Sequence, residues 1–86
     1  MPRLSAFYGV VIYMYIRDHG VPHIDASYGD ETALVEVATG LLLAGTLKPR
    51  QAGLVREWVE LHRAELLEAW QRASTGEPPG TIEPLP

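Results

Sequence analysis

The chain has 86 residues, a net charge of −4, 47% apolar residues and no cysteine. A chain of this length predicts one small domain over residues 1–86, near the lower limit for burying a core unaided. The missing thiols exclude disulfides and thiolate metal sites, and they fit a reducing cytoplasm. The acidic balance counts against a broad nucleic-acid surface. The apolar run over residues 7–16 is too short to cross a membrane and no cleavable leader precedes it, so we expect a cytoplasmic protein.

Residues 8–47 predict an antiparallel meander of about four strands. Their segments are rich in β-branched, aromatic or alternating apolar residues, which is typical of strands. Turn residues separate them, in particular Gly20 and Pro22 before the second strand and Gly29 after it. On the second strand His23, Asp25 and Ser27 share one face. The four predicted strands are residues 8–16, 23–28, 31–37 and 41–43.

One long C-terminal helix is predicted over about residues 49–75. Pro49 suits the first helical position, and Gly76 followed by prolines suits the stop. Between them apolar residues recur at helical spacing and form one stripe. Such a helix is roughly 37 Å long, longer than a small sheet is wide. We therefore expect one end to overhang, or to be covered by a partner or by residues 81–85 of the Pro/Gly-rich tail, residues 76–86. The fold class is α+β: a small antiparallel meander packed against this helix.

Polar side chains gather between the first two predicted strands, where residues 18–29 hold two of the three histidines. The candidate catalytic residues are His19, His23, Asp25 and His62. If the helix covers the sheet face that bears His23 and Asp25, then His62 converges with them. His23, Asp25 and His62 would then be candidate ligands for a divalent metal such as zinc, manganese or iron. The same residues also have a structural interpretation. His23 would pair with Asp25, and His62 would be an interior residue that bonds a backbone carbonyl or Asp25 while its ring packs against Trp58.

A second set of residues is suited to binding phosphate or an RNA backbone. Arg17 supplies positive charge beside the histidines, and aromatic rings can stack on bases. On a strand with two apolar faces, however, tyrosines are also ordinary core and boundary residues. The candidate binding residues are Arg17, Tyr13, Tyr15, Tyr28 and Arg50.

Leucines on the helix indicate a further contact. Leu67 falls on the charged side, and Leu54 and Leu61 flank the apolar stripe, so the apolar arc is wider than one thin sheet can cover. Small domains often complete their core by association. A protein partner, a second copy of the chain, or the folded-back tail are the candidates for covering these leucines.

An ordered set of short motifs along the whole chain resembles a known bacterial family, catalogued as domain of unknown function four-one-six-zero. The motifs that carry the likeness are Met1-Pro2, Phe7-Tyr8-Gly9, Met14-Tyr15, Asp18-His19, Pro22-His23, Ala26, Tyr28-Gly29, Thr39-Gly40, Gly45, Leu47, Arg50, Glu57-Trp58, Leu61-His62, Glu65-Leu66, Trp70, Gly76-Glu77-Pro78 and Ile82-Glu83-Pro84-Leu85. The family pattern usually reads Pro-Pro-His-Phe-His-Ala across the turn. This chain has Asp25 at the place of the second histidine, so a role that needs imidazole there does not carry over.

The resemblance implies an association and no chemical activity. Members resemble small cytoplasmic proteins encoded beside another short domain of unknown function, family two-four-four-two, in a pairing similar to toxin–antitoxin modules. The expected function is therefore a protein-binding component of such a pair, in the toxin-like position, with the neighbouring protein as partner. The alternative is an RNA-cleaving or metal-dependent hydrolytic enzyme that uses the His-rich hairpin end. The residues leave open whether the protein is an enzyme.

Overall fold

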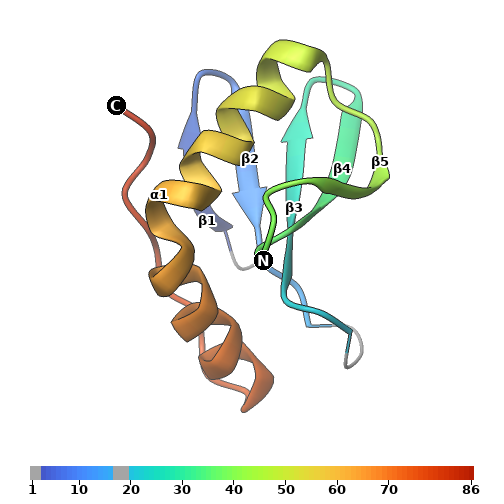
Figure 1. Cartoon of the computed structure of the whole chain (residues 1–86). Coiled ribbons are helices and arrows are strands. Elements are labelled where there is room, and N and C mark those ends of the chain that lie inside the picture. Colours follow the sequence, from blue (N-terminus) through green and yellow to red (C-terminus); the bar gives the residue numbers. More distant parts are fainter. Residues whose placement is uncertain (1–2, 17–19) are drawn as a thin grey trace.

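The computed structural model describes residues 3–16 and 20–86. Five antiparallel strands form one sheet in chain order, and one long helix packs on one of its faces (Figure 1). The predicted α+β class, an antiparallel sheet against one long C-terminal helix, is confirmed. The elements are β1 Arg3–Phe7, β2 Val10–Tyr13, β3 His23–Tyr28, β4 Glu31–Glu36, β5 Leu42–Gly45 and α1 Pro49–Ser74.

The described sheet has five strands rather than four, because a hairpin turn falls at Tyr8-Gly9. Both residues have positive φ, 50° and 82°, which is the backbone of a two-residue hairpin loop whose twist matches its strands. Tyrosine is unusual at such a position, so no turn was predicted there. The strand expected over residues 8–16 corresponds to β2, which spans only Val10–Tyr13, and the additional strand is β1 on the other side of this turn.

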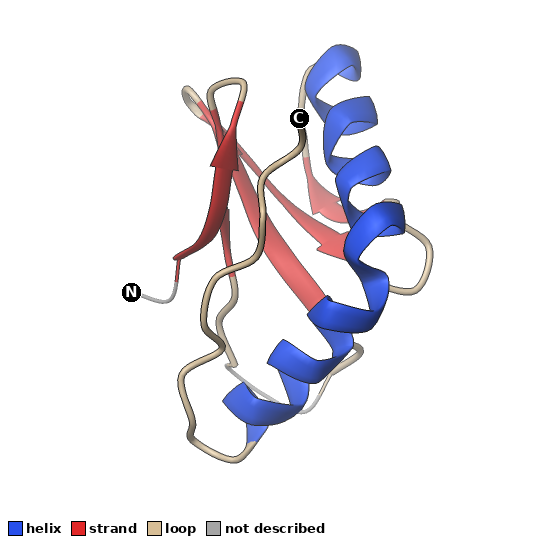
Figure 2. Cartoon of the chain, turned by 90° about the vertical axis from the view of Figure 1, so that its left-hand side faces the viewer, coloured by secondary structure: helices blue, strands red, loops and turns tan. Residues whose placement is uncertain are grey.

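The core lies between α1 and the sheet face that carries the apolar residues of the central strands. Ile12, Ile24 and Val35 from β2, β3 and β4 are fully buried against Trp58 and Leu66 of α1. Figure 2 shows the helix running along one side of the sheet. The alternation predicted for these strands therefore points its apolar side chains toward the helix.

Local sequence sets both ends of α1. Pro49 lies in the first turn, where its missing N–H removes no helical bond. At the other end the N–H of Gly76 donates to the Ala73 carbonyl at 3.1 Å and that of Glu77 to the Arg72 carbonyl at 2.9 Å, and Gly76 has φ of 87°. This is the Schellman arrangement that a glycine permits. No helix among residues 3–16 and 20–86 is long and apolar enough to cross a membrane.

The tail, residues 76–86, turns back and runs beside α1 over the β1 side of the sheet (Figure 2). The Ile82 N–H donates to the Leu4 carbonyl at 2.9 Å, and the Trp58 indole donates to the Glu83 carbonyl at 2.8 Å. Ile82 and Leu85 are buried in the core. Of the covers expected for the helix, the chain supplies its own tail along β1. Leu61 stays 61% exposed, so the tail leaves the outer side of α1 open.

Candidate functional site

His23 stands at the start of β3 and contacts the C-terminal half of the helix. Its ring centroid lies 5.0 Å from that of Trp70, at 57°. Its Nδ1 is 2.8 Å from the Val21 carbonyl, so Nδ1 carries the proton and donates. In the neutral ring this leaves Nε2 as the acceptor, the tautomer that a general base requires.

Asp25 follows on the same strand but lies on the sheet face that α1 does not cover. Its cross-strand neighbours are Tyr13 on β2 and Leu34 on β4, and it is only 6% exposed. Its neighbours Ile24 and Ala26 point into the core under the helix. Because successive strand residues point to opposite faces, the burial of Ile24 and Ala26 directs Asp25 away from α1.

His62 lies in the middle of α1, where the helix departs from regular geometry. Its backbone has φ of −116° and ψ of 22°, outside the helical range. Its ring centroid is 5.6 Å from that of Trp58, and its Nδ1 is 2.7 Å from Glu65 Oε1. The interior position against Trp58 agrees with the structural interpretation, but the polar partner is Glu65 rather than a carbonyl or Asp25. Its Nε2 is buried and has no hydrogen-bond partner among the described residues.

The predicted metal ligands His23, Asp25 and His62 are not brought together. The helix covers the Ile24 face of β3, so the condition for their convergence is not met. The two histidines also contact tryptophans 12 positions apart on α1, roughly 18 Å along the axis. Within residues 3–16 and 20–86, no group of three or more histidine or carboxylate side chains could hold a metal ion. His19 and Arg17, the other residues proposed for this end, lie outside the described residues.

The candidate binding residues fall in three different places. Tyr13 and Tyr15 stack with ring centroids 5.8 Å apart and planes at 19°. Tyr28 ends β3 and packs against the core. Arg50 is exposed in the first turn of α1. Only the Tyr13–Tyr15 pair therefore forms a local platform, and Arg50 belongs to a different surface.

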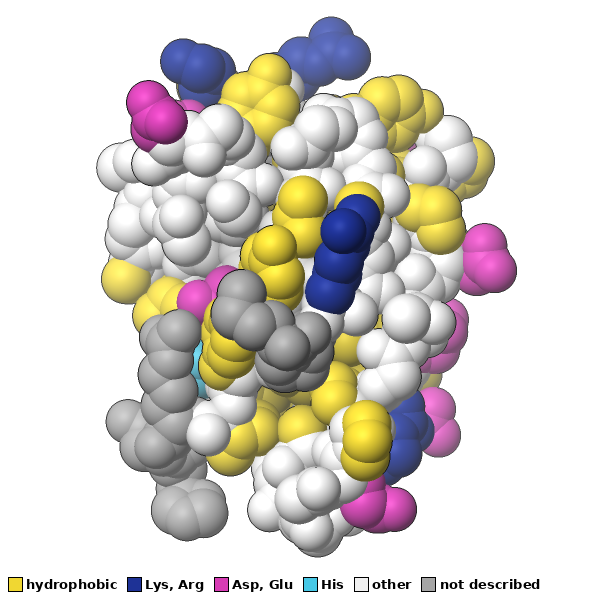
Figure 3. All heavy atoms as spheres, turned by 180° about the vertical axis from the view of Figure 1, so that it is seen from behind, with side chains coloured by type: hydrophobic (Ala, Val, Ile, Leu, Met, Phe, Trp, Pro, Cys, Tyr) yellow, Lys and Arg dark blue, Asp and Glu magenta, His cyan; other side chains and the backbone are white. Residues whose placement is uncertain are grey.

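The helix leaves the opposite face of the sheet uncovered. One cross-strand row passes from Arg3 on β1 through Tyr13, Asp25 and Leu34 to Ala44 on β5. Figure 3 looks onto this side and shows hydrophobic side chains gathered over its middle, with a Lys or Arg side chain lying across them. We call this surface the open face.

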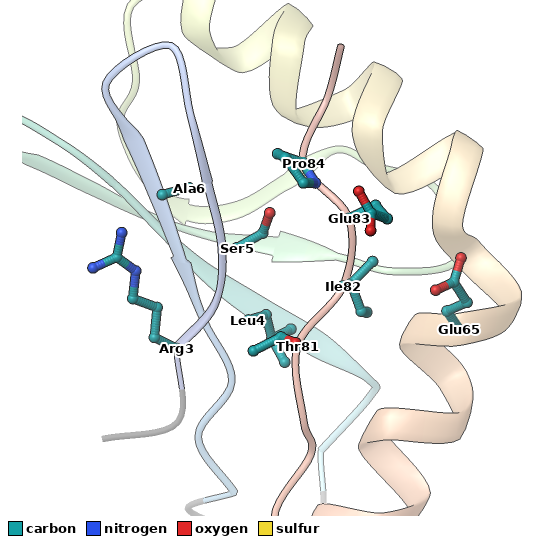
Figure 4. A pocket seen from close by; sticks show the side chains of 9 residues that line it. All are labelled: Arg3, Leu4, Ser5, Ala6, Glu65, Thr81, Ile82, Glu83 and Pro84. Carbon is teal, nitrogen blue, oxygen red and sulfur yellow. The ribbon is translucent and has the colours of Figure 1, made fainter.

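A cleft of about 670 Å³ lies between β1, the tail and α1 (Figure 4). The Ser5 side chain is directed toward the tail segment that carries Ile82 and Glu83, and Glu65 lies on the α1 side. Ser5 is 8% exposed, and its hydroxyl has no hydrogen-bond partner among the described residues. Sequence reasoning missed this cleft because a lone serine before an unrecognised turn carries no pattern. The Glu65–His62 pair could orient an imidazole as a base, but the buried Nε2 presents no surface to a ligand.

A family model described as Domain of unknown function (DUF4160) matches residues 9–71. The chain belongs to this family. No curated protein matches it, and no solved structure does. The match runs from the β1–β2 turn into the C-terminal half of α1, and so includes His23, Asp25 and His62. In this DUF4160 chain, β1 and the tail lie outside the matched range, as do all residues of the cleft except Glu65.

The resemblance led us to expect a histidine at the position of Asp25, which lies on the open face between Tyr13 and Leu34. Asp25 therefore lies outside the helix-covered core.

Proposed function

We propose that this DUF4160 protein is the toxin-like, protein-binding component of a toxin–antitoxin-like pair and acts in the cytoplasm. The observation that supports this most strongly is the composition of the open face. An antiparallel sheet with one solvated face normally alternates apolar inward and polar outward residues. On β2 the outward positions are instead taken by Val11 and Tyr13, and on β4 Leu34 stands between the polar outward residues Thr32 and Glu36; the three apolar side chains are all part-buried. Apolar side chains on the outward side of a sheet favour a macromolecular contact.

The partner we propose is the neighbouring-gene product of family two-four-four-two that the family resemblance implies. Two further features of the chain support a protein as partner. Leu61 and Leu67 on α1 remain 61% and 44% exposed, so the tail does not cover the apolar residues on the outer side of the helix. The Tyr13–Tyr15 pair adds aromatic area, the residue type enriched in protein interfaces.

The test is to express the protein with and without the neighbouring product and to measure both growth and complex formation. We expect growth inhibition by the protein alone, relief by the neighbouring product, and a stable complex on size-exclusion chromatography. Val11→Lys on the open face should weaken the complex by about tenfold or more, because it places a charge within apolar contact area. Gln71→Lys, at an exposed position of α1 outside these apolar residues, is the matched control. Failure of the two proteins to associate would overturn the proposal.

RNA cleavage is the second candidate function, and the geometry of His23 is what favours it. The bond from Nδ1 to the Val21 carbonyl fixes the tautomer and leaves Nε2 available as a base near the surface. This candidate predicts that His23→Ala keeps the fold and abolishes both RNA cleavage and toxicity. If His23→Ala loses only stability or partner affinity, the histidine is structural. The metal-dependent version has no support from the placement of His23, Asp25 and His62.

A further inference from the structure

The two outer strands of the sheet, β1 and β5, differ in how the rest of the described chain covers them. Along β1 the tail lies as an extended segment, and the Ile82 N–H donates to the Leu4 carbonyl. Along β5, on the other side in Figure 1, no described segment is hydrogen-bonded beyond the pairing with β4. An outer strand of this kind presents unpaired N–H and C=O groups to any extended chain that reaches it.

β5 is short and its pairing with β4 is irregular between Leu34 and Val35, but it lacks the charge and proline that most directly block an edge. Its residues, Leu42 to Gly45, include no charge and no proline, whereas edges are commonly blunted by lysine, proline or inward-pointing charges. Leu41 and Leu43 are 52% and 49% exposed, so the edge is also flanked by apolar surface. It is a short apolar edge strand without charge or proline.

Gly45 holds this edge tightly on the sheet. It has φ of 78°, and a Cβ added there would lie 2.2 Å from the Thr32 carbonyl oxygen and 2.9 Å from the Ala33 Cα. Only glycine permits so close an approach in this backbone conformation. The β5 edge is therefore a fixed template within the sheet.

Positive charge follows the edge directly. Lys48 and Arg50 come within five residues of Gly45, and the first turn of α1 contains no acidic residue. Neither of their side chains forms an ion pair within the described residues, since Glu31 accepts a bond only from the backbone N–H of Lys48. Arg56, six residues after Arg50, is already paired with Glu60 at 3.2 Å. Two cations without an ion pair among the described residues thus follow the edge closely along the chain, in a protein whose net charge is −4.

We propose that the β5 edge is the docking site for an extended, acidic segment of the protein partner, which adds to the sheet as a sixth strand. Main-chain hydrogen bonds to β5 supply affinity, and alternate side chains of the segment supply specificity. Its apolar side chains lie against Leu41 and Leu43, and its carboxylates face Lys48 and Arg50. This inference rests on the proposed function and names the chemistry of the partner.

A second copy of the chain is a poorer occupant than an acidic segment. The β5 strand of a second copy carries no carboxylate and is followed by the same two cations. It would add apolar contact without complementary charge, and electrostatic complementarity is what gives an interface its selectivity.

The test uses two capped probe peptides, one alternating valine and glutamate and one alternating valine and lysine, with backbone-amide NMR of the full chain. We expect the acidic peptide to shift and saturate the amides of residues 42–45 and to bind about tenfold more tightly than the basic one. Leu43→Lys should abolish these shifts, while Leu67→Lys, a change at a similarly exposed leucine on α1, should not. The double variant Lys48→Glu/Arg50→Glu should reverse the preference between the peptides.

Absence of shifts in residues 42–45, equal binding of the two peptides, or shifts confined to the open face would overturn the docking site. So would a concentration-dependent dimer that Leu43→Lys dissolves, because the occupant would then be a second copy. The neighbouring-gene product separates this inference from the proposed function. If it binds wild type and Leu43→Lys equally, the edge is wrong and the proposed function stands. If it does not bind while the acidic peptide does, the proposed function fails and the edge stands.

Discussion

The two edges of the sheet, β1 and β5, differ in whether another segment of the chain covers them. Both β1 and β5 are short outer strands with a single strand partner. The β1 edge is closed by a main-chain hydrogen bond from Ile82 and by the burial of Ile82 and Leu85. The β5 edge remains uncovered by the described chain, although its leucines are about half exposed. The chain therefore shows at β1 how an extended segment docks, and offers at β5 the same kind of surface for another.

The largest expected effect comes from the residue that joins helix, sheet and tail. Trp58 is fully buried, contacts Phe7 at 5.5 Å between ring centroids and donates to the Glu83 carbonyl. Trp58→Ala should destabilise the protein by about 3–5 kcal/mol, a large part of the stability of a small domain. Urea denaturation measures this. Trp58→Phe keeps most of the packing but loses the bond to the tail, so its free energy of unfolding should fall between those of the wild type and Trp58→Ala. Equal stability of all three proteins would contradict this account.

Loosening the tail from the β1 edge should have the next largest effect on stability. Ile82→Ala removes a buried side chain from beneath β1 and should cost about 2 kcal/mol, toward the lower end of the range for such truncations because the site lies near the surface. The exposed neighbour Glu83 gives the control, since Glu83→Ala should change stability by less than about 0.5 kcal/mol. Thermal unfolding followed by circular dichroism compares them. Indistinguishable variants would mean that the tail does not hold the β1 edge.

Two glycine substitutions should have effects of opposite sign. Gly45→Ala forces a Cβ into the backbone of β4 at a positive φ and should destabilise the protein by more than about 1 kcal/mol. Gly53 lies on α1 with open space around its Cβ position. Gly53→Ala should stabilise by about 0.5–1 kcal/mol. Denaturation midpoints decide the signs, and a harmless Gly45→Ala would show that β5 is not held as described.

The smallest expected effect on stability is at the open edge itself. Leu43→Lys and Leu67→Lys both replace exposed leucines, so each should change the free energy of unfolding by less than about 0.5 kcal/mol. The two variants should differ only in binding. A large loss of stability in Leu43→Lys alone, seen in the same urea titration, would reveal a packing role for this side chain.

Local patterns in the sequence were sufficient for much of the fold. Pro49 and Gly76 marked the limits of α1 because both act through their own backbone geometry. The alternation on β3 separated Ile24 and Ala26 from Asp25. The turn at Tyr8-Gly9 was missed because tyrosine rarely takes a positive φ, and the strand count was therefore one too low.

The candidate site depended on a non-local fact, namely which face of the sheet the helix covers. Both faces of β2 are apolar, so this strand could not decide the question. With His23 against Trp70 and His62 against Trp58, the expected cluster separates along the helix. The open β5 edge could not be predicted from the sequence either. A leucine run such as residues 41–43 has the same pattern whether or not another segment covers the outer edge of its strand.

The central claim is that this protein recognises an acidic partner segment through the β5 edge. It is tested most directly by amide hydrogen exchange of the protein alone and in complex with the neighbouring-gene product. We expect new protection at residues 42–45 in the complex, with the amides of Leu4 and Ile82 unchanged because the tail already covers that edge. Protection that appears only at β1, only on the open face, or nowhere in the sheet would contradict the claim.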